Sequence, residues 1–269
     1  MRRSMLPSPS ISLFSLLALL TGCAGVPQQG SWGAYWPNAG ALRDAAGDAA
    51  KNPRTWAPLT GAALLTVTGL DNDVSDWLAD EAPLFGSGAP RASDRLRDAA
   101  VAGYLLTALA APGESAREKL SGLGVGIVTL YAQGMLVEGA KEVADRRRPD
   151  RSDRLSFPSG HTSTASAATL LGMRNLAYID MPSSARTVVN LGFEGLAIST
   201  GWARVEARKH YVADVLAGYA VGHFMAAFAQ SAFIDRALPG AQVRFHPIDG
   251  GGALRLTLPV SPRTIAAPR

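Results

Sequence analysis

The sequence predicts an all-α protein, a helical bundle of about six core helices followed by a small C-terminal β-hairpin. Hydrophobic residues make up 47% of the 269 residues and aromatic residues only 7%. Such a core, rich in Ala, Leu, Val and Gly, favours close-packed helices over a β-sandwich. From about Ala41 onward the apolar pattern is helical. In the tail, Val243–Phe245 and Leu254–Leu258 alternate apolar with polar residues around Asp249–Gly252, which is typical of a hairpin.

The chain begins with a targeting segment. Arg2 and Arg3 precede a short apolar stretch, Ile11–Leu20, which is too short to cross a bilayer as a helix. We therefore expect residues 1–22 to be a signal peptide and residues 23–40 a tether. Residues 41–238 form the helical domain, and residues 239–269 hold the hairpin and a flexible tail.

The end of the targeting segment, Leu20-Thr21-Gly22-Cys23, resembles the lipobox of bacterial lipoproteins. The resemblance implies that Cys23 is lipidated and holds the protein on the periplasmic side of a bacterial membrane. Because Ala24 follows where an Asp would retain a lipoprotein at the inner membrane, the outer membrane is favoured. The alternative is an ordinary signal peptide with a chance cysteine. Cys23 is the single cysteine, so no intrachain disulfide can form.

Eight helical segments are expected, of which two are long and uncharged. Residues 121–137 and 215–234 are long enough to cross a membrane. Their Ala, Gly, Thr and polar residues favour instead the interior of a soluble bundle. The expected segments are Leu42–Lys51, Pro58–Leu70, Asp73–Asp80, a helix capped by Ser93-Asp94 and ending at Ala111, Ala116–Asp145, Ser159–Tyr178, Ser184–Trp202 and His210–Ile234.

The formal net charge of +4 is too small to indicate a nucleic-acid partner. Basic residues are instead concentrated between Lys141 and Arg154. Lys141 and Arg148, seven positions apart, share one face of a helix, and Pro149 favours a non-helical Arg148 at its end. Two cations that converge, one of them a planar guanidinium, form an anion site. A solvated basic face is the simpler alternative.

A second motif, Phe157-Pro-Ser-Gly-His161-Thr, opens a helix. Ser159 is a natural N-cap, and Gly160 lets a ligand approach the backbone. The free N–H groups and positive dipole end of the first turn suit a phosphate. His161 beside such an anion could protonate a leaving oxygen, or could merely cap the turn.

The third motif runs from Arg204 to Asp214. His210 and Asp214 lie four positions apart, hence on one helical face. A carboxylate that holds one ring nitrogen leaves the other free to attack. A surface His–Asp pair is the alternative, but an unpaired carboxylate within this apolar stretch would be costly.

In order, the three motifs resemble the signature of the type 2 phosphatidic acid phosphatase superfamily: Lys, six residues, Arg-Pro; Pro-Ser-Gly-His; Ser-Arg, five residues, His, three residues, Asp. Every spacing matches, and the one departure is Ala203 in place of Ser. The matched region, from Lys141 to Asp214, covers a little over a quarter of the chain.

The resemblance implies a metal-independent, cofactor-free phosphatase with a helical-bundle fold. His210 would attack phosphorus to form a phosphohistidine, Asp214 would orient it, and His161 would protonate the leaving group. The implied phosphate ligands are Lys141, Arg148, Ser159, Gly160 and Arg204.

The substrate would be a phosphorylated lipid or a small phosphoester, with lipid phosphates favoured, and the oligomeric state stays open. Two other functions remain compatible with the sequence. One is a vanadium-dependent haloperoxidase, which shares this site but usually has a much longer chain. The other is a non-catalytic, anion-binding envelope lipoprotein.

Overall fold

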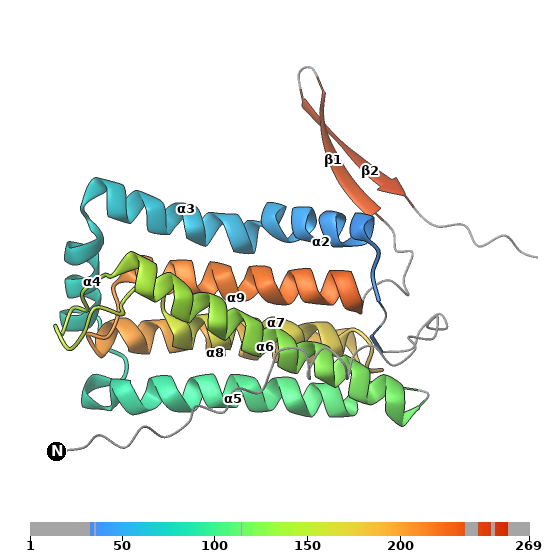
Figure 1. Cartoon of the computed structure of the whole chain (residues 1–269), viewed down its shortest axis with the longest axis horizontal. Helices are drawn as coiled ribbons and strands as arrows, with labels where there is room; N and C mark the ends of the chain where they lie inside the picture. Colours follow the sequence, from blue (N-terminus) through green and yellow to red (C-terminus); the bar gives the residue numbers. More distant parts are fainter. Residues whose placement is uncertain (1–32, 35, 114, 235–241, 249–250, 258–269) are drawn as a thin grey trace, which may run out of the picture.

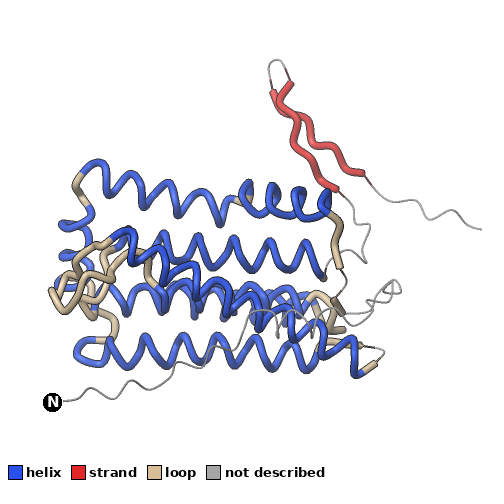
Figure 2. The backbone as a smooth tube through the Cα atoms, viewed as in Figure 1, coloured by secondary structure: helices blue, strands red, loops and turns tan. Residues whose placement is uncertain are grey.

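The computed structural model describes residues 33–34, 36–113, 115–234, 242–248 and 251–257 (Figures 1 and 2). The long helices run side by side, so the helical part has two ends, and α4 marks one of them (Figure 1). The described elements are α2 (Ala39–Lys51), α3 (Pro53–Thr68), α4 (Asp71–Asp80), the 3-10 helix η1 (Gly86–Gly88), α5 (Ala89–Ala110), α6 (Ala116–Ala144), α7 (Gly160–Leu176), α8 (Ser183–Glu206), α9 (Val212–Phe233), β1 (Gln242–Ile248) and β2 (Gly251–Thr257).

The predicted composition of the fold, about six core helices completed by a hairpin, is wrong. The described residues form eight α-helices. The short strands β1 and β2 pair antiparallel with each other alone, and Figure 1 shows them apart from the helices. A two-stranded ribbon without a partner surface adds no layer to a core. The folded domain is therefore helical throughout. The signal peptide, Cys23 and residues 258–269 lie outside the described residues.

Helices α3 and α5 begin several residues earlier than the sequence predicts. Helix α3 starts at Pro53 rather than Pro58, because the Asn52 side chain accepts a hydrogen bond from Arg54 N and proline suits the first helical position. Helix α5 starts at Ala89, so Ser93 and Asp94 lie inside the helix rather than capping it. The side chain of Asp94 therefore does not cap the helix and can contact a residue of another helix.

Helix α9 is the central helix and packs against α2, α3, α6, α7 and α8. Its contact with α7 depends on two glycines. A Cβ atom on Gly218 would lie 2.4 Å from the carbonyl oxygen of Ser159, and one on Gly222 would lie 2.1 Å from that of Ser163. Since no side chain fits at these distances, glycine is required, and the start of α7 is held directly against α9.

The outer surface of the bundle carries many large apolar side chains. Helices α6 and α9 are both long and apolar enough to cross a membrane, and α9 is the more buried of the two. A surface with so many exposed apolar residues is unusual for a water-soluble monomer, which weakens the expectation of a soluble bundle. On α6 these exposed residues are Leu120, Ile127, Tyr131, Met135, Leu136 and Val143.

Candidate active site

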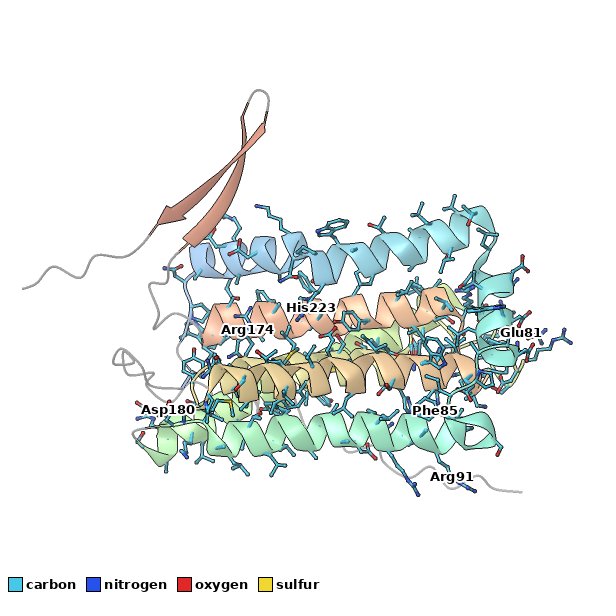
Figure 3. The ribbon with its side chains drawn as sticks, turned by 180° about the vertical axis from the view of Figure 1, so that it is seen from behind. Glu81, Phe85, Arg91, Arg174, Asp180 and His223 are labelled. Atoms are coloured by element: carbon cyan, nitrogen blue, oxygen red, sulfur yellow. The ribbon has the colours of Figure 1, made fainter. Side chains whose placement is uncertain are left out.

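All predicted site residues within the helical domain meet at the α4 end of the bundle. Chain direction explains this convergence, because α6 and α8 end there while α5, α7 and α9 begin there (Figure 1). Glu81, Phe85 and Arg91 mark the same end in the side-chain view, with Arg174 and Asp180 toward the opposite end (Figure 3). Residues separated by up to 73 positions in the motifs therefore share one pocket region.

His210 lies in the linker between α8 and α9 and is 1% exposed. Its Nδ1 atom is 2.6 Å from the carbonyl oxygen of Ser156. A carbonyl oxygen only accepts, so Nδ1 carries the proton and Nε2 keeps its lone pair. Nε2 faces Arg148, with 3.3 Å between it and Nη1. Burial lowers the pKa of His210 to about 4, and the charge of Arg204 acts in the same direction. The ring is therefore neutral at pH 7, with its proton on Nδ1 and its lone pair on Nε2.

Asp214 is fully buried in the first turn of α9. It accepts hydrogen bonds from residues around His210 but none from His210 itself. Its Oδ2 atom accepts hydrogen bonds from Ser156 Oγ at 2.5 Å and from Tyr211 N at 2.9 Å. Its Oδ1 atom accepts one from Arg146 at 2.6 Å. The nearest carboxylate oxygen is 3.8 Å from Nδ1 of His210, beyond hydrogen-bonding distance. Ser156 thus links the two residues that the sequence pairs directly.

The N-terminus of α7 is open to a ligand. Its first amide groups have no acceptor within the helix. The N-cap residue Ser159 bonds Thr162 Oγ1 at 3.0 Å through its hydroxyl and does not cap the backbone. Lys141, in the last turn of α6, points here, because a Cβ on Gly160 would lie 3.4 Å from its Nζ. Lys141 Nζ also donates to Glu138 at 2.6 Å. A cation and a helix dipole therefore act on the same point.

Arg148 and Arg204 complete the positive side of the site. Arg148 donates to Asp153 at 2.6 Å and to the carbonyl oxygen of Lys209 at 3.0 Å, which fixes the guanidinium beside His210. Arg204 is 9% exposed, and among the described residues its Nε has no hydrogen-bond partner. Burial lowers the pKa of Arg204 to about 10, with repulsion from Arg148 adding to this shift. An anion bound between the two guanidinium groups would relieve both effects.

His161, in the first turn of α7, has partners that the sequence did not indicate. Its Nε2 lies 2.7 Å from Asp94 Oδ1 and 2.7 Å from Arg97 Nη1, both on α5. A carboxylate accepts and a guanidinium donates, so one nitrogen cannot satisfy both at once: a proton on Nε2 selects Asp94. Burial lowers the pKa of His161 to about 4, Arg204 lowers it further, and Asp94 opposes the shift. A bound phosphate would favour the protonated form.

Asp94 and Arg97 are the functional residues that sequence reasoning missed. Ser93-Asp94 ahead of an apolar run has the appearance of a helix cap, and this local pattern concealed the contact with His161. The charge spacing contained a weak signal. Asp94 and Arg97 are three apart on one helical face, next to the otherwise apolar second half of α5.

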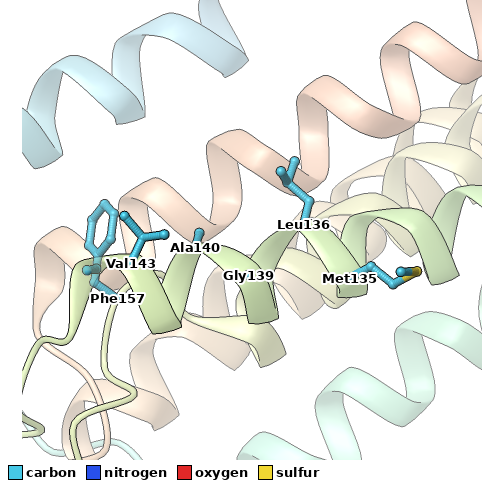
Figure 4. A pocket seen from close by; sticks show the side chains of 7 residues that line it. Met135, Leu136, Gly139, Ala140, Val143 and Phe157 are labelled. Carbon is cyan, nitrogen blue, oxygen red and sulfur yellow. The ribbon is translucent and has the colours of Figure 1, made fainter.

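A shallow apolar groove of about 520 Å³ lies along the outer face of α6, next to this end of the bundle (Figure 4). It reaches from Met135 to Phe157, which precedes the Pro-Ser-Gly-His motif. Its remaining lining residues are Leu136, Gly139, Ala140, Val143 and Ala144.

The fold and the site define a helical bundle with a cluster of cationic side chains and two histidines at one end. The sequence profile of the PAP2 superfamily matches residues 122–236, so this part of the chain is similar to that superfamily. The matched stretch includes all three motifs. It excludes α2 to α5, and with them Asp71, Asp94 and Arg97.

A curated relative is the lipid A 1-phosphatase of Porphyromonas gingivalis, which is 35% identical over 89 residues. The match covers 33% of this chain and 19% of the relative, so the chain spans only about a fifth of that protein's length. Among solved structures, the chain is similar to a transmembrane PAP2 type phosphatidylglycerolphosphate phosphatase from Bacillus subtilis. The TM-score is 0.50 at 20% identity, over 66% of this chain and 92% of that one. This likeness shows the fold.

Proposed function

We propose that the chain is a phosphatase that hydrolyses a phosphomonoester or pyrophosphate, with a lipid phosphate as substrate, through a phosphohistidine on His210. The observation that carries the proposal is the position of a neutral, buried His210 within a cluster of cations. Nε2 of His210 is unprotonated and lies 3.3 Å from Arg148 Nη1, and the buried Arg204 has an Nε without a hydrogen-bond partner among the described residues. A phosphoryl group could bind both guanidinium groups and be attacked by Nε2.

In the first step, Nε2 of His210 attacks phosphorus and the bond from phosphorus to the leaving oxygen breaks. Protonated His161, whose Nε2 proton bonds Asp94, gives its other ring proton, on Nδ1, to that oxygen, so the product leaves as an alcohol or as a phosphate monoester. Lys141, Arg148, Arg204 and the amide groups of α7 stabilise the charge on the phosphoryl oxygens. Because these groups are cationic or dipolar, the proposed step needs no metal ion.

In the second step, water attacks the phosphohistidine and the N–P bond breaks, which returns the electron pair to Nε2. His161, neutral after the first step, accepts the proton of the attacking water. The hydrogen bond from Nδ1 to Ser156 stays in place throughout and keeps the ring in one orientation. Phosphate then leaves, and the starting protonation states are restored.

Three observations support a lipid as the substrate. The relative and the structural neighbour are named as a lipid A 1-phosphatase and a phosphatidylglycerolphosphate phosphatase. The apolar groove on α6 lies beside the site and could receive a hydrocarbon chain. The exposed apolar surface of the bundle suits a membrane-associated enzyme. Attachment through a lipid at Cys23, on the periplasmic side and at the outer membrane, remains part of the proposal.

The function is tested by measuring phosphate release from a phosphatidate, an isoprenyl pyrophosphate and a soluble aryl phosphate under identical conditions. We expect the highest kcat/KM for one of the two lipids, and alkaline quenching should trap a covalent phosphoenzyme, because a phosphohistidine is stable in base and hydrolyses in acid. Halide oxidation by peroxide after addition of vanadate, without phosphate release, would favour the haloperoxidase. Absence of both activities would favour an anion-binding protein.

The groove provides a sharper prediction about the lipid. Gly139→Phe places a large side chain where a Cβ meets nothing within 4 Å, so the variant should fold normally. If a hydrocarbon chain lies in the groove, kcat/KM for the lipid should fall about tenfold relative to that for the aryl phosphate, which corresponds to about two lost CH₂ contacts. Gly195→Phe on α8 is the matched control, since Gly195 is equally open and exposed. An equal effect of both variants on the lipid would place the hydrocarbon chain elsewhere.

A further inference from the structure

We propose that Arg146 and Asp71 are positioning residues for His210, acting through Asp214 and Ser156. The proposal rests on the proposed function for its kinetic consequence, but its structural content is independent of the substrate. Arg146 is not part of the three motifs, and Asp71 lies outside the stretch that matches the PAP2 superfamily. Neither residue was predicted from the sequence to belong to the site.

The Arg146 guanidinium joins two buried carboxylates. Its Nη1 donates to Asp214 Oδ1 at 2.6 Å, and its Nη2 donates to Asp71 Oδ2 at 2.7 Å. The group also lies over the ring of Tyr211, with 4.3 Å from Cζ to the ring centroid. A planar fork can hold two acceptors in this way, whereas an ammonium group is a single point charge. Both donor nitrogens face carboxylates, so the contacts assign Arg146 a role other than binding phosphate.

Asp71 connects this pair to the start of α9. It is the first residue of α4 and follows Gly69, whose left-handed conformation ends α3. Its Oδ1 accepts from Ala213 N at 2.8 Å, and Ser75 Oγ of the same helix accepts from Val212 N at 2.9 Å. Side chains of α4 thus accept hydrogen bonds from the first amide groups of α9, in contrast to the open N-terminus of α7. The segment before the stretch that matches the PAP2 superfamily therefore fixes the helix that carries Asp214.

Ser156 transmits this arrangement to the nucleophile. Its N–H donates to the carbonyl oxygen of Arg146 at 3.0 Å, and its hydroxyl donates to Asp214 at 2.5 Å. Its own carbonyl oxygen accepts the Nδ1 proton of His210 at 2.6 Å. Three hydrogen bonds thus lead from the Arg146 backbone and Asp214 to the ring that attacks phosphorus. A shift of Asp214 would move Ser156, and with it the orientation of Nε2.

The charges around His210 allow the proposal to be tested through the pH dependence of the reaction rate. His210 faces Asp214 from α9, Arg148 from the linker after α6, and Arg204 from α8. Arg146 neutralises Asp214. Its removal leaves an uncompensated carboxylate 3.8 Å from Nδ1. A negative charge favours the protonated ring, so the pKa of His210 should rise from about 4. The acid limb of the rate profile would then move to higher pH.

The experiment compares Arg146→Met with Arg147→Met, since Arg147 is the adjacent, exposed arginine. We expect Arg146→Met to lower kcat by about 10- to 100-fold with little change in KM, as for a slight misplacement of a reacting group. The acid limb should shift upward, and Arg147→Met should change neither quantity. Arg146→Lys should restore activity only in part, because one ammonium cannot bridge both carboxylates.

A second readout requires no turnover. The chain has four histidines, so the ¹⁵N NMR titration of His210 can be assigned with the His210→Ala variant. Arg146→Met should raise the titration midpoint of His210 above that of the wild type. If Arg146→Met does not fold, Asp71→Asn, which keeps the Arg146–Asp214 bond, should give a smaller shift in the opposite direction, because it removes a negative charge from the cluster.

The outcomes separate the two proposals. An NMR shift in a protein that hydrolyses no phosphoester would preserve the positioning role and overturn the phosphatase. An active wild type in which Arg146→Met matches Arg147→Met in kcat, pH profile and titration would overturn the positioning role alone.

Discussion

His210→Ala should reduce phosphate release by about 10⁴-fold or more, the usual effect of removing a nucleophile that no neighbour can replace. The structure explains why no replacement exists. His210 alone has an unprotonated nitrogen facing Arg148, since the hydrogen bond from Nδ1 to Ser156 fixes its tautomer. His161 is bound to Asp94 and Arg97 on α5 and has a different orientation. Phosphate release is the measurement.

The control for His210→Ala is His223→Gln. His223 is another buried histidine, on α9, and it bonds Thr55 Oγ1 at 2.8 Å through Nδ1. Glutamine can preserve such a bond, so activity should remain close to that of the wild type. Circular dichroism of both variants checks that they fold. Retention of activity in His210→Ala would exclude a covalent mechanism through His210.

His161→Ala should have an effect that depends on the leaving group. For an alkyl phosphate, loss of the general acid should lower kcat by about 10²- to 10⁴-fold. An aryl phosphate releases a weakly basic phenolate, which needs little protonation, so the loss should be much smaller. A plot of log kcat against leaving-group pKa for wild type and variant measures this difference directly.

Asp94→Asn is the companion variant for His161. The amide can still accept from Nε2 but no longer carries the charge that opposes the lowering of the His161 pKa. Protonated His161 should therefore become scarcer, and alkyl phosphates should be affected more than aryl phosphates, as for His161→Ala but to a smaller extent. Equal losses on all leaving groups would show that these residues only maintain the pocket.

The predicted site residues of the helical domain lie together because each motif sits where a helix begins or ends. Lys141 and Arg204 fall in last turns, and Gly160 and Asp214 in first turns, positions that caps and spacing reveal locally. The predicted direct bond from Asp214 to His210 is replaced by a link through Ser156, since α9 turns the carboxylate toward Arg146. The spacing of two residues in the sequence predicts that they share one face of a helix. It does not predict which other side chains compete for their hydrogen bonds.

Asp71, Asp94 and Arg146 could not be predicted, because their roles depend on contacts between distant segments. Asp71 and Asp214 are 143 positions apart in the chain and meet only through Arg146. No local pattern distinguishes Asp94 from a helix cap or Arg146 from its basic neighbours. The helical character of the domain followed from composition, whereas the starts of two helices were missed because Asn52-Pro53 and Pro90 begin them ahead of the apolar pattern.

The glycine contacts between α7 and α9 have a consequence for how the enzyme moves. They hold the N-terminus of α7 and the first turn of α9, which carries Asp214, in fixed positions relative to each other. The hydrogen bond from Ser159 N to the Asp214 carbonyl oxygen at 2.9 Å adds to this. The partner of the general acid, Asp94, belongs to a different helix, α5. His161 itself belongs to α7, so a displacement of α5 would alter the contact between His161 and Asp94 while leaving the packing of α7 on α9 unchanged.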